Sequence, residues 1–485
     1  MTTESSSTGK NLGLWLHPAI MFILLVSGWF LPPVSTITPF GMKIVGIFAG
    51  LIYGWIFVGL IWPSLTGMLF LSFAGLGSAK AVFGQGFGSE VVLLIIFFGI
   101  FTKWLEDIGL TNTFAQWLLS RKFLAGRPYV FIFMIFFVTF MCSFFVGIYA
   151  AIFVMWGICY RILLNVGYEK HEKTSAFLLI GVAYVSIMGM TIKPWSAWSL
   201  LGTSALTKAT GLAYEFLPYS TFMLAISLSS ILLFLLAGKF IIGIDVAKLK
   251  QMDYTATVGQ LQYTTEQKIG TALLAFILIA LYLPSTLDKE STLYGFLNNL
   301  GAVGVIGIVT VILCLFQFQQ KPLLDFAQTA ARGVPWHMIC LLSCVGPLGS
   351  ALMHENAQIT PAVITALQPL LAGKSPFMMY FLILVIALVL TQFMNNTVLL
   401  VALTPIFCKI AGLVGANPYI ITAILIFALS AALATPGASS RAGLVFGNTE
   451  WIAVKDAYFQ SILSVLCVFI AMLVVGLPLG LLLFS

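Results

Sequence analysis

Residues 390–398 read Leu-Thr-Gln-Phe-Met-Asn-Asn-Thr-Val, inside a run from 377 to 407 that is otherwise almost wholly apolar. Asn395, Asn396 and Thr397 place three polar side chains in succession within that run. A bilayer core offers no water to hydrogen-bond such groups, so they need partners within the protein or a water-filled cavity. The stretch therefore indicates a turn or helix break that lines a cavity inside a membrane protein.

The composition indicates an all-α polytopic membrane protein. Of the 485 residues, 60% are hydrophobic and only 8% are charged, whereas about a quarter are charged in a soluble globular protein. Apolar stretches near or above the roughly 18 to 20 residues that cross a bilayer recur from Leu14 to Phe484. They leave no room for a soluble catalytic domain. We expect a multi-pass protein of the cell's inner (plasma) membrane.

The net charge of +7 comes from basic residues that gather in loops, for example 121–127 and 239–250. Because cytoplasmic loops are enriched in Lys and Arg, this pattern indicates membrane orientation rather than nucleic-acid binding. Two apolar blocks, 129–160 and 377–408, are too long for one comfortable span and too short for two. Basic residues flank both ends of the first block, so we interpret each block as a re-entrant hairpin. The expected total is about eleven transmembrane helices, with the N-terminus cytoplasmic and the C-terminus outside.

A weak internal repeat supports the hairpins. Each is followed by an apolar segment, 175–207 or 418–448, that proline and small polar residues break near its middle. Hairpins and broken helices in two inverted repeats are typical of secondary transporters that bind substrate near the bilayer midplane. The expected parts are N-terminal scaffold helices at 1–61, a first repeat at 62–243, an inside loop with a linker helix at 244–297 and a second repeat at 298–485.

Several motifs carry a resemblance to a known family. They are NNT followed eight residues later by Pro405, ATPGASSRAGLVFG at 434–447, TGMLFLSFAG near Thr66, GFGSEVVLLIIFFGIFTKWLEDIGL at 86–110 and FGNTEWIAVKDAY at 446–458. On these motifs the chain resembles the divalent anion/sodium symporter family over nearly its whole length. The resemblance implies a homodimer that carries di- or tricarboxylates or sulfate by an elevator motion. It also implies that Asn396 and Thr397 contact the substrate carboxylate, while Asn395 and the break at 435–438 frame a sodium site.

The first half of the chain departs from the family pattern. Alignment of FMCSFF at 140–145 with FMNNT at 393–397 leaves Ser143 as the one obvious donor. Lys193 and Arg441 lie in or beside the two helix breaks, where a charge costs about 2.5 to 3.5 kcal/mol by insertion scales. We interpret them as fixed cations that replace sodium beside the anion. This interpretation favours sodium-independent anion exchange.

Other interpretations of the same residues remain open. Lys193 and Arg441 can instead snorkel to an interface or pair with an acid. In a sodium-coupled carrier, Asn395, Thr435 and Ala438 would hold the ion. Proton coupling and facilitated transport are further alternatives. Apart from sodium, no metal or cofactor is expected.

The remaining candidate site residues belong to the two breaks. They are Pro194, Trp195, Thr435, Pro436, Ser439 and Ser440. Trp195 and Trp198 can line the site or anchor the broken helix. The first-choice substrate is a dicarboxylate or 2-oxoacid such as malate, succinate or 2-oxoglutarate, with citrate, sulfate or an aromatic monocarboxylate as alternatives. The expected partners are this small anion, the lipid bilayer and a second copy of the chain, but no nucleic acid.

A membrane-embedded enzyme and a channel are the rival classes. The four histidines form no H-E-x-x-H pair, and the chain has no G-x-S-x-G nucleophile motif. Metal-assisted or nucleophilic catalysis therefore lacks support in the sequence. A channel needs a continuous wet path, whereas the polar residues cluster at two breaks and leave the other helices dry. Alternating access is favoured over both.

Overall fold

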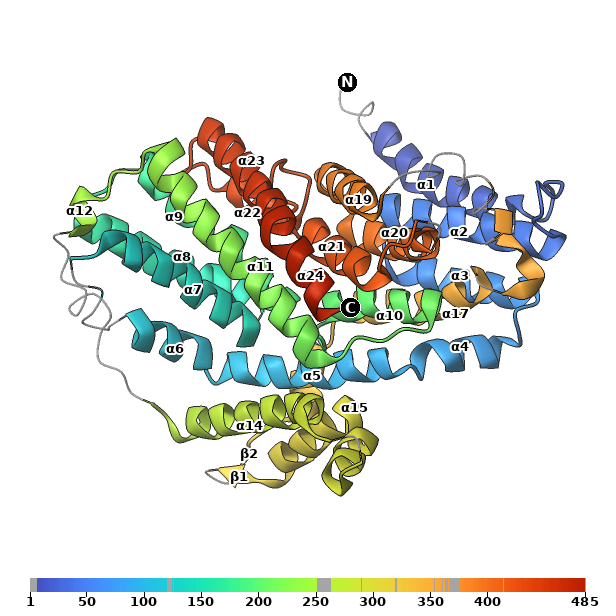
Figure 1. The fold of residues 1–485 in the computed structure, drawn as a ribbon, viewed down its shortest axis with the longest axis horizontal. Helices are drawn as coiled ribbons and strands as arrows, with labels where there is room; N and C mark the ends of the chain where they lie inside the picture. The colour runs from blue at the N-terminus through green and yellow to red at the C-terminus, as the bar shows by residue number, and fades with distance from the viewer. Residues whose placement is uncertain are drawn as a thin grey trace.

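The computed structural model describes residues 7–119, 124, 126–145, 147–250, 263–288, 290–318, 321–352, 354–359, 361–362, 365, 375–412 and 414–484. Residues 121–122 of the first basic loop and 251–262 of the expected inside loop lie outside this part of the chain. Within it the fold is helical, apart from a two-stranded antiparallel ribbon that pairs Gln317 with Pro322 (Figure 1).

The first half consists of helices of very different lengths. They are α1 (Ser7–Ser27), α2 (Pro39–Phe57), α3 (Ile61–Ala74), α4 (Ala79–Phe87), α5 (Glu90–Asp107), α6 (Leu110–Leu119), α7 (Pro128–Phe145), α8 (Ile148–Val166), α9 (Lys173–Thr191), α10 (Ala197–Thr210), α11 (Phe216–Ala237), the π-helix η2 (Gly238–Ile242) and α12 (Ala247–Lys250).

The second half begins with a helix pair and the ribbon. Its elements are α14 (Thr265–Tyr282), η3 (Leu283–Thr286), α15 (Thr292–Leu315), β1 (Gln317–Phe318), β2 (Lys321–Pro322), α16 (Phe326–Gly333), α17 (Trp336–Leu352), η4 (Glu355–Ala357), α19 (Pro376–Leu390), α20 (Asn396–Ala411), α21 (Pro418–Ser430), α22 (Ser440–Gly447), α23 (Val454–Ala471), η5 (Met472–Gly476) and α24 (Leu477–Leu483).

The expectation of an all-α polytopic membrane protein is confirmed. Eight helices in the described ranges are long and apolar enough to cross a membrane, and the bent pairs α4–α5 and α16–α17 raise the number to ten. Three of the expected eleven spans are shorter, because α1 is apolar only over Trp15–Ser27, α3 has 14 residues and α21 has 13. Helix α21 is short because it stops at the predicted break.

Both hairpins are present. In the first, α7 ends at Phe145 and α8 begins at Ile148, and in the second α19 and α20 flank residues 391–395. Helix α8 continues to Val166, beyond the expected end of the block at residue 160. Its Arg161 stays helical because the side chain is exposed and its Nε donates to the Gly157 carbonyl at 3.3 Å. By length, each arm of the first hairpin also suffices to span a membrane.

A broken helix follows each hairpin. Helices α9 and α10 are separated by residues 192–196, and α21 and α22 by residues 431–439. Helix α9 is the centre of the packing: residues 174–189 are all buried, and α7, α8, α11, α21, α22 and α23 contact it. Each half thus has the same order of elements, namely a bent pair, a hairpin, a broken helix and a long apolar helix.

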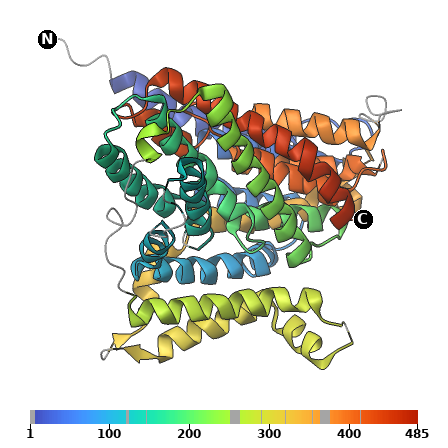
Figure 2. The same cartoon turned by 60° about the vertical axis from the view of Figure 1, so that its left-hand side comes forward.

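Helices α14 and α15 form a separate layer. Both views place them below α5 and apart from the hairpins and breaks (Figures 1 and 2). Helix α15 contains a backbone break at Gly301, whose φ of 59° lies in the left-handed region that glycine adopts without strain.

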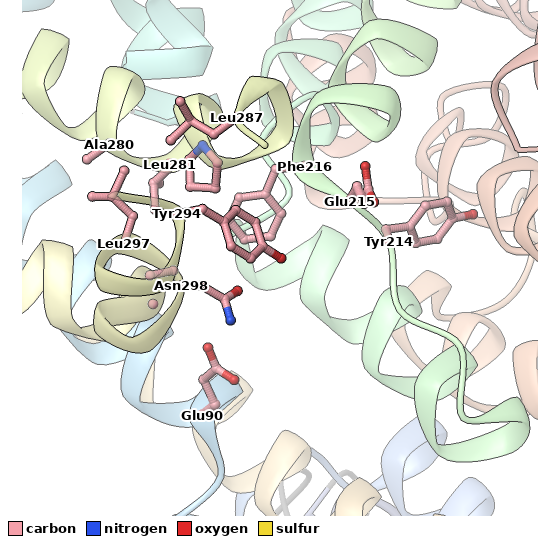
Figure 3. A pocket seen from close by; sticks show the side chains of 13 residues that line it. Glu90, Tyr214, Glu215, Phe216, Ala280, Leu281, Leu287, Tyr294, Leu297 and Asn298 are labelled. Atoms are coloured by element: carbon pink, nitrogen blue, oxygen red, sulfur yellow. The ribbon is translucent and has the colours of Figure 1, made fainter. Parts of the chain in front are cut away.

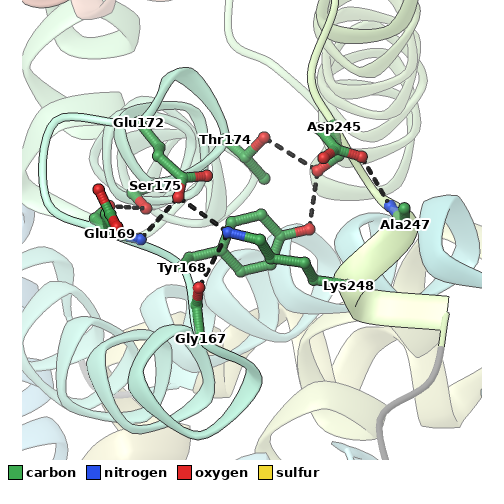
Figure 4. A network of polar contacts seen from close by, with 9 residues as sticks. All are labelled: Gly167, Tyr168, Glu169, Glu172, Thr174, Ser175, Asp245, Ala247 and Lys248. Carbon is green, nitrogen blue, oxygen red and sulfur yellow. Dashed lines mark hydrogen bonds and ion pairs between the residues drawn. The ribbon is translucent and has the colours of Figure 1, made fainter.

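Polar contacts close the end of the molecule where α8 meets α9. The Tyr168 hydroxyl and the Thr174 hydroxyl donate to the Asp245 carbonyl at 2.7 and 3.0 Å (Figure 4). Lys248 forms an ion pair with Glu172 at 2.9 Å. These contacts tie the loop between α8 and α9 to the segment that follows α11, so the first hairpin is anchored at its open end.

Candidate functional site

A cavity of about 590 Å³ lies at the tip of the second hairpin. Its described lining comes from both hairpins, helices α9 and α10, the second break and its flanking helices, and helices α2 and α17 with Leu60 after α2: Ile56, Leu60, Ile148, Tyr149, Ile187, Trp198, His337, Met338, Phe393, Met394, Asn395, Asn396, Thr397, Ser430, Gly437, Ala438, Ser439, Ser440 and Arg441. No Asp or Glu is among these residues. The tip predicted from the sequence therefore opens into a cavity whose charged lining is cationic.

Two helix N-termini meet at this cavity. The Asn395 side-chain oxygen accepts from the backbone N–H groups of Thr397 and Val398 at 3.0 and 3.2 Å and so caps α20. Ser439 caps α22, with its Oγ accepting from the Ala442 N–H at 3.2 Å. A helix N-terminus carries partial positive charge and unpaired N–H groups. Two of them at one cavity favour an anion.

Gln392 holds the second break in place. Its side chain is buried, and its Nε2 donates to the carbonyls of Leu388 and Ala431 at 2.9 and 3.2 Å. Its Oε1 accepts from the N–H groups of Leu433 and Ala434 at 3.2 and 2.9 Å. These bonds satisfy backbone groups that the break leaves outside any helix, which a membrane interior requires.

Thr391 and Thr435 extend this support. The Thr391 hydroxyl bonds the Leu429 carbonyl at 2.8 Å and the side chain of Asn396 at 2.9 Å. With its amide oriented so that nitrogen faces acceptors, Asn396 also donates to the Met394 carbonyl at 3.1 Å. The Thr435 hydroxyl donates to the Gln392 carbonyl. The hairpin tip and the break are therefore one bonded unit.

Arg441 is the charged group of the cavity. It is only 4% exposed, and its two terminal nitrogens donate to the Ala183 carbonyl at 3.1 Å and the Ser430 carbonyl at 2.6 Å. Ser430 is the last residue of α21, so the guanidinium also meets the negative end of that half-helix. No carboxylate in the described part of the chain lies within ion-pair distance of Arg441. Its charge is buried without a compensating acid.

The first hairpin supplies Ile148 and Tyr149 to this cavity, with Tyr149 46% exposed. Ser143 is placed differently. It is fully buried, and its hydroxyl donates to the Ser186 carbonyl on α9. Helices α7 and α9 approach closely at Gly189: a Cβ atom added to this glycine would lie 2.1 Å from the Phe140 carbonyl oxygen. Ser143 thus fastens α7 to α9.

Lys193 lies in a different cavity, of about 260 Å³, together with Trp195 and Ser196. The Trp195 ring stacks on Phe98 of α5 at 5.5 Å between centroids. Among the described residues, the two cavities share no lining residue.

A third cavity, of about 420 Å³, lies between α15 and the N-terminus of α11. In Figure 3 the Glu90 carboxyl group faces the Asn298 amide across it, with Tyr294 beside them. Glu215 also lines this cavity. Two carboxylates and no cation in its described lining make it a poor site for an anion.

Comparison with known proteins shows the family to which the chain belongs. A model of the CitMHS family, described as citrate transporter, matches residues 48–432. The chain belongs to the citrate transporter family. This member of the citrate transporter family is therefore a multi-pass membrane transporter of the secondary type, and not an enzyme.

One solved structure and one protein sequence are also similar to this citrate transporter family member. The crystal structure of the Alcanivorax borkumensis YdaH transporter, described as having an unusual topology, matches with a TM-score of 0.65 at 14% identity, over 97% of this chain and 98% of that one. At this identity the likeness shows the fold alone. The uncharacterized transporter YfbS of Escherichia coli (strain K12) is 28% identical over 140 residues, which are 29% of this chain and 22% of that protein.

The structure gathers about half of the sequence-predicted site residues in the Arg441 cavity. These are Asn395, Asn396, Thr397, Ala438, Ser439, Ser440 and Arg441. Lys193 and Trp195 line the second cavity. Four predicted residues line neither: Ser143, Pro194, Thr435 and Pro436.

Sequence reasoning missed several residues of this citrate transporter family member. Gln392 lies inside the stretch that was singled out, and its spacing of three residues from Asn395 is a signal for a shared turn. Tyr149, just after the tip of the first hairpin, also lines the cavity. His337 at the start of α17 and Ser430 at the end of α21 reach the cavity only through the packing of distant segments. No sequence pattern marks those two.

Proposed function

We propose that this protein exchanges organic di- or tricarboxylate anions across the membrane without sodium. The observation that carries the proposal is the Arg441 cavity, where a buried guanidinium without an acidic partner lies beside two helix N-termini. Both groups suit a carboxylate, since guanidinium and backbone N–H donors form charge-assisted hydrogen bonds to it.

The polar side chains of the cavity fit a carboxylate in detail. The Asn395 oxygen is used by the helix cap, which leaves its amide nitrogen as a donor. Thr397 and Ser440 add hydroxyl groups, and Arg441 has more N–H donors than the two it uses within the protein. If one carboxylate of the substrate binds Arg441, the other polar groups remain free to bind a second carboxylate. A substrate with two or three carboxylates matches this distribution.

The charge of the cavity favours exchange over sodium symport. Two oxygens of the alternative sodium set are already engaged, because the Asn395 side-chain oxygen caps α20 and the Thr435 carbonyl accepts from the Ala438 N–H at 3.1 Å. A fixed cation cannot leave with the substrate. An empty carrier therefore keeps a buried, uncompensated charge, which costs several kcal/mol. The empty carrier would therefore change slowly between its inward-facing and outward-facing states unless another anion binds. Transport is then an obligatory exchange of anions.

The proposal includes an elevator motion of the hairpins and breaks and a homodimer, as the divalent anion/sodium symporter resemblance implies. It also includes a location in the plasma membrane with a cytoplasmic N-terminus and an outside C-terminus, as the composition and the basic loops predict. Citrate is the first anion to test because the family is described by it. Succinate and malate are next, since they present two carboxylates to the same donors.

The test is uptake of labelled citrate, succinate or malate into sodium-free proteoliposomes. Vesicles preloaded with the same unlabelled anion are compared with empty vesicles. We expect uptake into preloaded vesicles alone, unchanged when sodium is added. Uptake that appears only on adding sodium would overturn the exchange mechanism and favour the sodium-coupled alternative.

A further inference from the structure

Lys193 is, with Arg441, one of two buried cations among the described residues. It lies in the break between α9 and α10 and is 9% exposed. Its Nζ sits over the ring of Phe144, 5.8 Å from the centroid. Within the described ranges its ammonium group has no hydrogen bond and no ion pair. A buried ammonium group that is not compensated is costly, so a counterion is expected.

The cavity beside Lys193 is lined by parts of three regions. They are helix α5, the first hairpin tip with the break that follows it, and the α16–α17 bend. The charged described residues among them are Lys103, Glu106, Lys193 and Arg332. The wall on the α5 side is tight, because a Cβ at Gly99 would lie 2.7 Å from the Gly333 carbonyl oxygen. The backbones of α5 and of the α16–α17 bend are therefore in close contact at this wall of the cavity.

The other charges of this cavity are already compensated. Lys103 forms ion pairs with Glu106 and Asp107 at 3.0 and 3.2 Å. Arg332 pairs with Asp107 at 2.9 Å. Lys193 is outside this network, so it is the one lining cation left for a ligand among the described residues.

Two helix N-termini also meet here. Gly147 precedes the first residue of α8, and Ser196 caps α10 by accepting from the Ser199 N–H at 3.1 Å. The N-termini of α20 and α22 likewise line the Arg441 cavity. Each hairpin tip and the break that follows it therefore frame a cavity with one buried, uncompensated cation.

We propose that the Lys193 cavity is a second binding site for a carboxylate anion, separate from the Arg441 cavity, so that one chain holds two anions. The proposal rests on the proposed function for the class of anion. The tip of the first hairpin separates the two sites, since Gly147 lines one cavity and Ile148 and Tyr149 line the other.

Replacement of Lys193 by methionine is a suitable test. The side chains are similar in length, and removing an uncompensated buried charge does not leave a partner unsatisfied. The variant should therefore fold. Lys208→Met is the matched control, because this lysine lies on α10 and lines neither cavity. Arg441→Gln removes the cation of the other site.

The measurement is equilibrium dialysis of labelled citrate, and separately of labelled succinate, with the purified full chain. We expect about two anions bound per chain for the wild type and for Lys208→Met, and one for Lys193→Met or Arg441→Gln. One anion per chain in the wild type, or two in Lys193→Met, would overturn the second site. If Lys193→Met binds one anion and Arg441→Gln still binds two, the site at Lys193 is supported. The proposed substrate site at Arg441 is then contradicted. Absence of binding in the wild type would overturn both.

Discussion

Neutralising Arg441 is the sharpest perturbation of the proposed substrate site. Arg441→Gln keeps a polar side chain of moderate length but removes the positive charge that faces the cavity. A hydrogen bond to a charged group contributes about 1.5 to 3 kcal/mol. A guanidinium that binds a carboxylate through two N–H groups thus contributes about 3 kcal/mol or more. Since about 1.4 kcal/mol corresponds to a tenfold change, we expect Kd for the transported anion to rise at least about a hundredfold.

The effect on folding should be small by comparison. The variant loses the bonds to the Ala183 and Ser430 carbonyls, but it also relieves the burial of an uncompensated charge. The assay is binding of labelled anion to purified protein, with thermal unfolding measured in parallel. Arg161→Gln is the control, because Arg161 is an exposed arginine on α8 that lies outside the cavity. A wild-type Kd in Arg441→Gln would refute the role of the guanidinium.

Three further substitutions separate the supporting residues from the binding residues. Gln392→Leu should lower the free energy of unfolding by about 3 kcal/mol, because buried backbone groups of the break lose partners. Thermal unfolding checks this, with Gln460→Leu as the control, because the Gln460 side chain donates to the Lys173 carbonyl at 3.4 Å. A loss no larger than in the control would contradict the prediction. Ser143→Ala should cost about 1 kcal/mol of stability with an unchanged Kd, and a tenfold weaker Kd would instead place Ser143 in the site. Asn395→Asp should keep the helix cap and unfolding temperature but weaken anion binding by repulsion, whereas equal or tighter binding would argue for a cation at this position.

The parts of the fold that depend on local sequence could be predicted. The hairpins and breaks are visible because proline and small polar residues interrupt long apolar runs, and no bilayer-exposed helix tolerates such interruptions without a partner. The cluster at 395–397 and residues 438–441 at the second break were found in this way, and the structure brings them to one cavity.

The parts that depend on packing between distant segments could not be predicted. Ser143 was aligned with the second hairpin tip, but the close approach of α7 and α9 at Gly189 turns its hydroxyl to the Ser186 carbonyl. Lys193 and Arg441 were expected beside one anion, whereas each reaches a different cavity. The rotation of a helix about its axis decides which side of a break a side chain faces. This rotation cannot be deduced from a single sequence.

The central claim is that an organic anion occupies the Arg441 cavity, and a density map of the purified protein with citrate bound tests it most directly. We predict density for the anion between the N-termini of α20 and α22, with a carboxylate within hydrogen-bonding distance of the Arg441 guanidinium. Density in the cavity of Glu90 and Glu215, or an ion held by Asn395 and Thr435 with no anion at Arg441, would contradict the account.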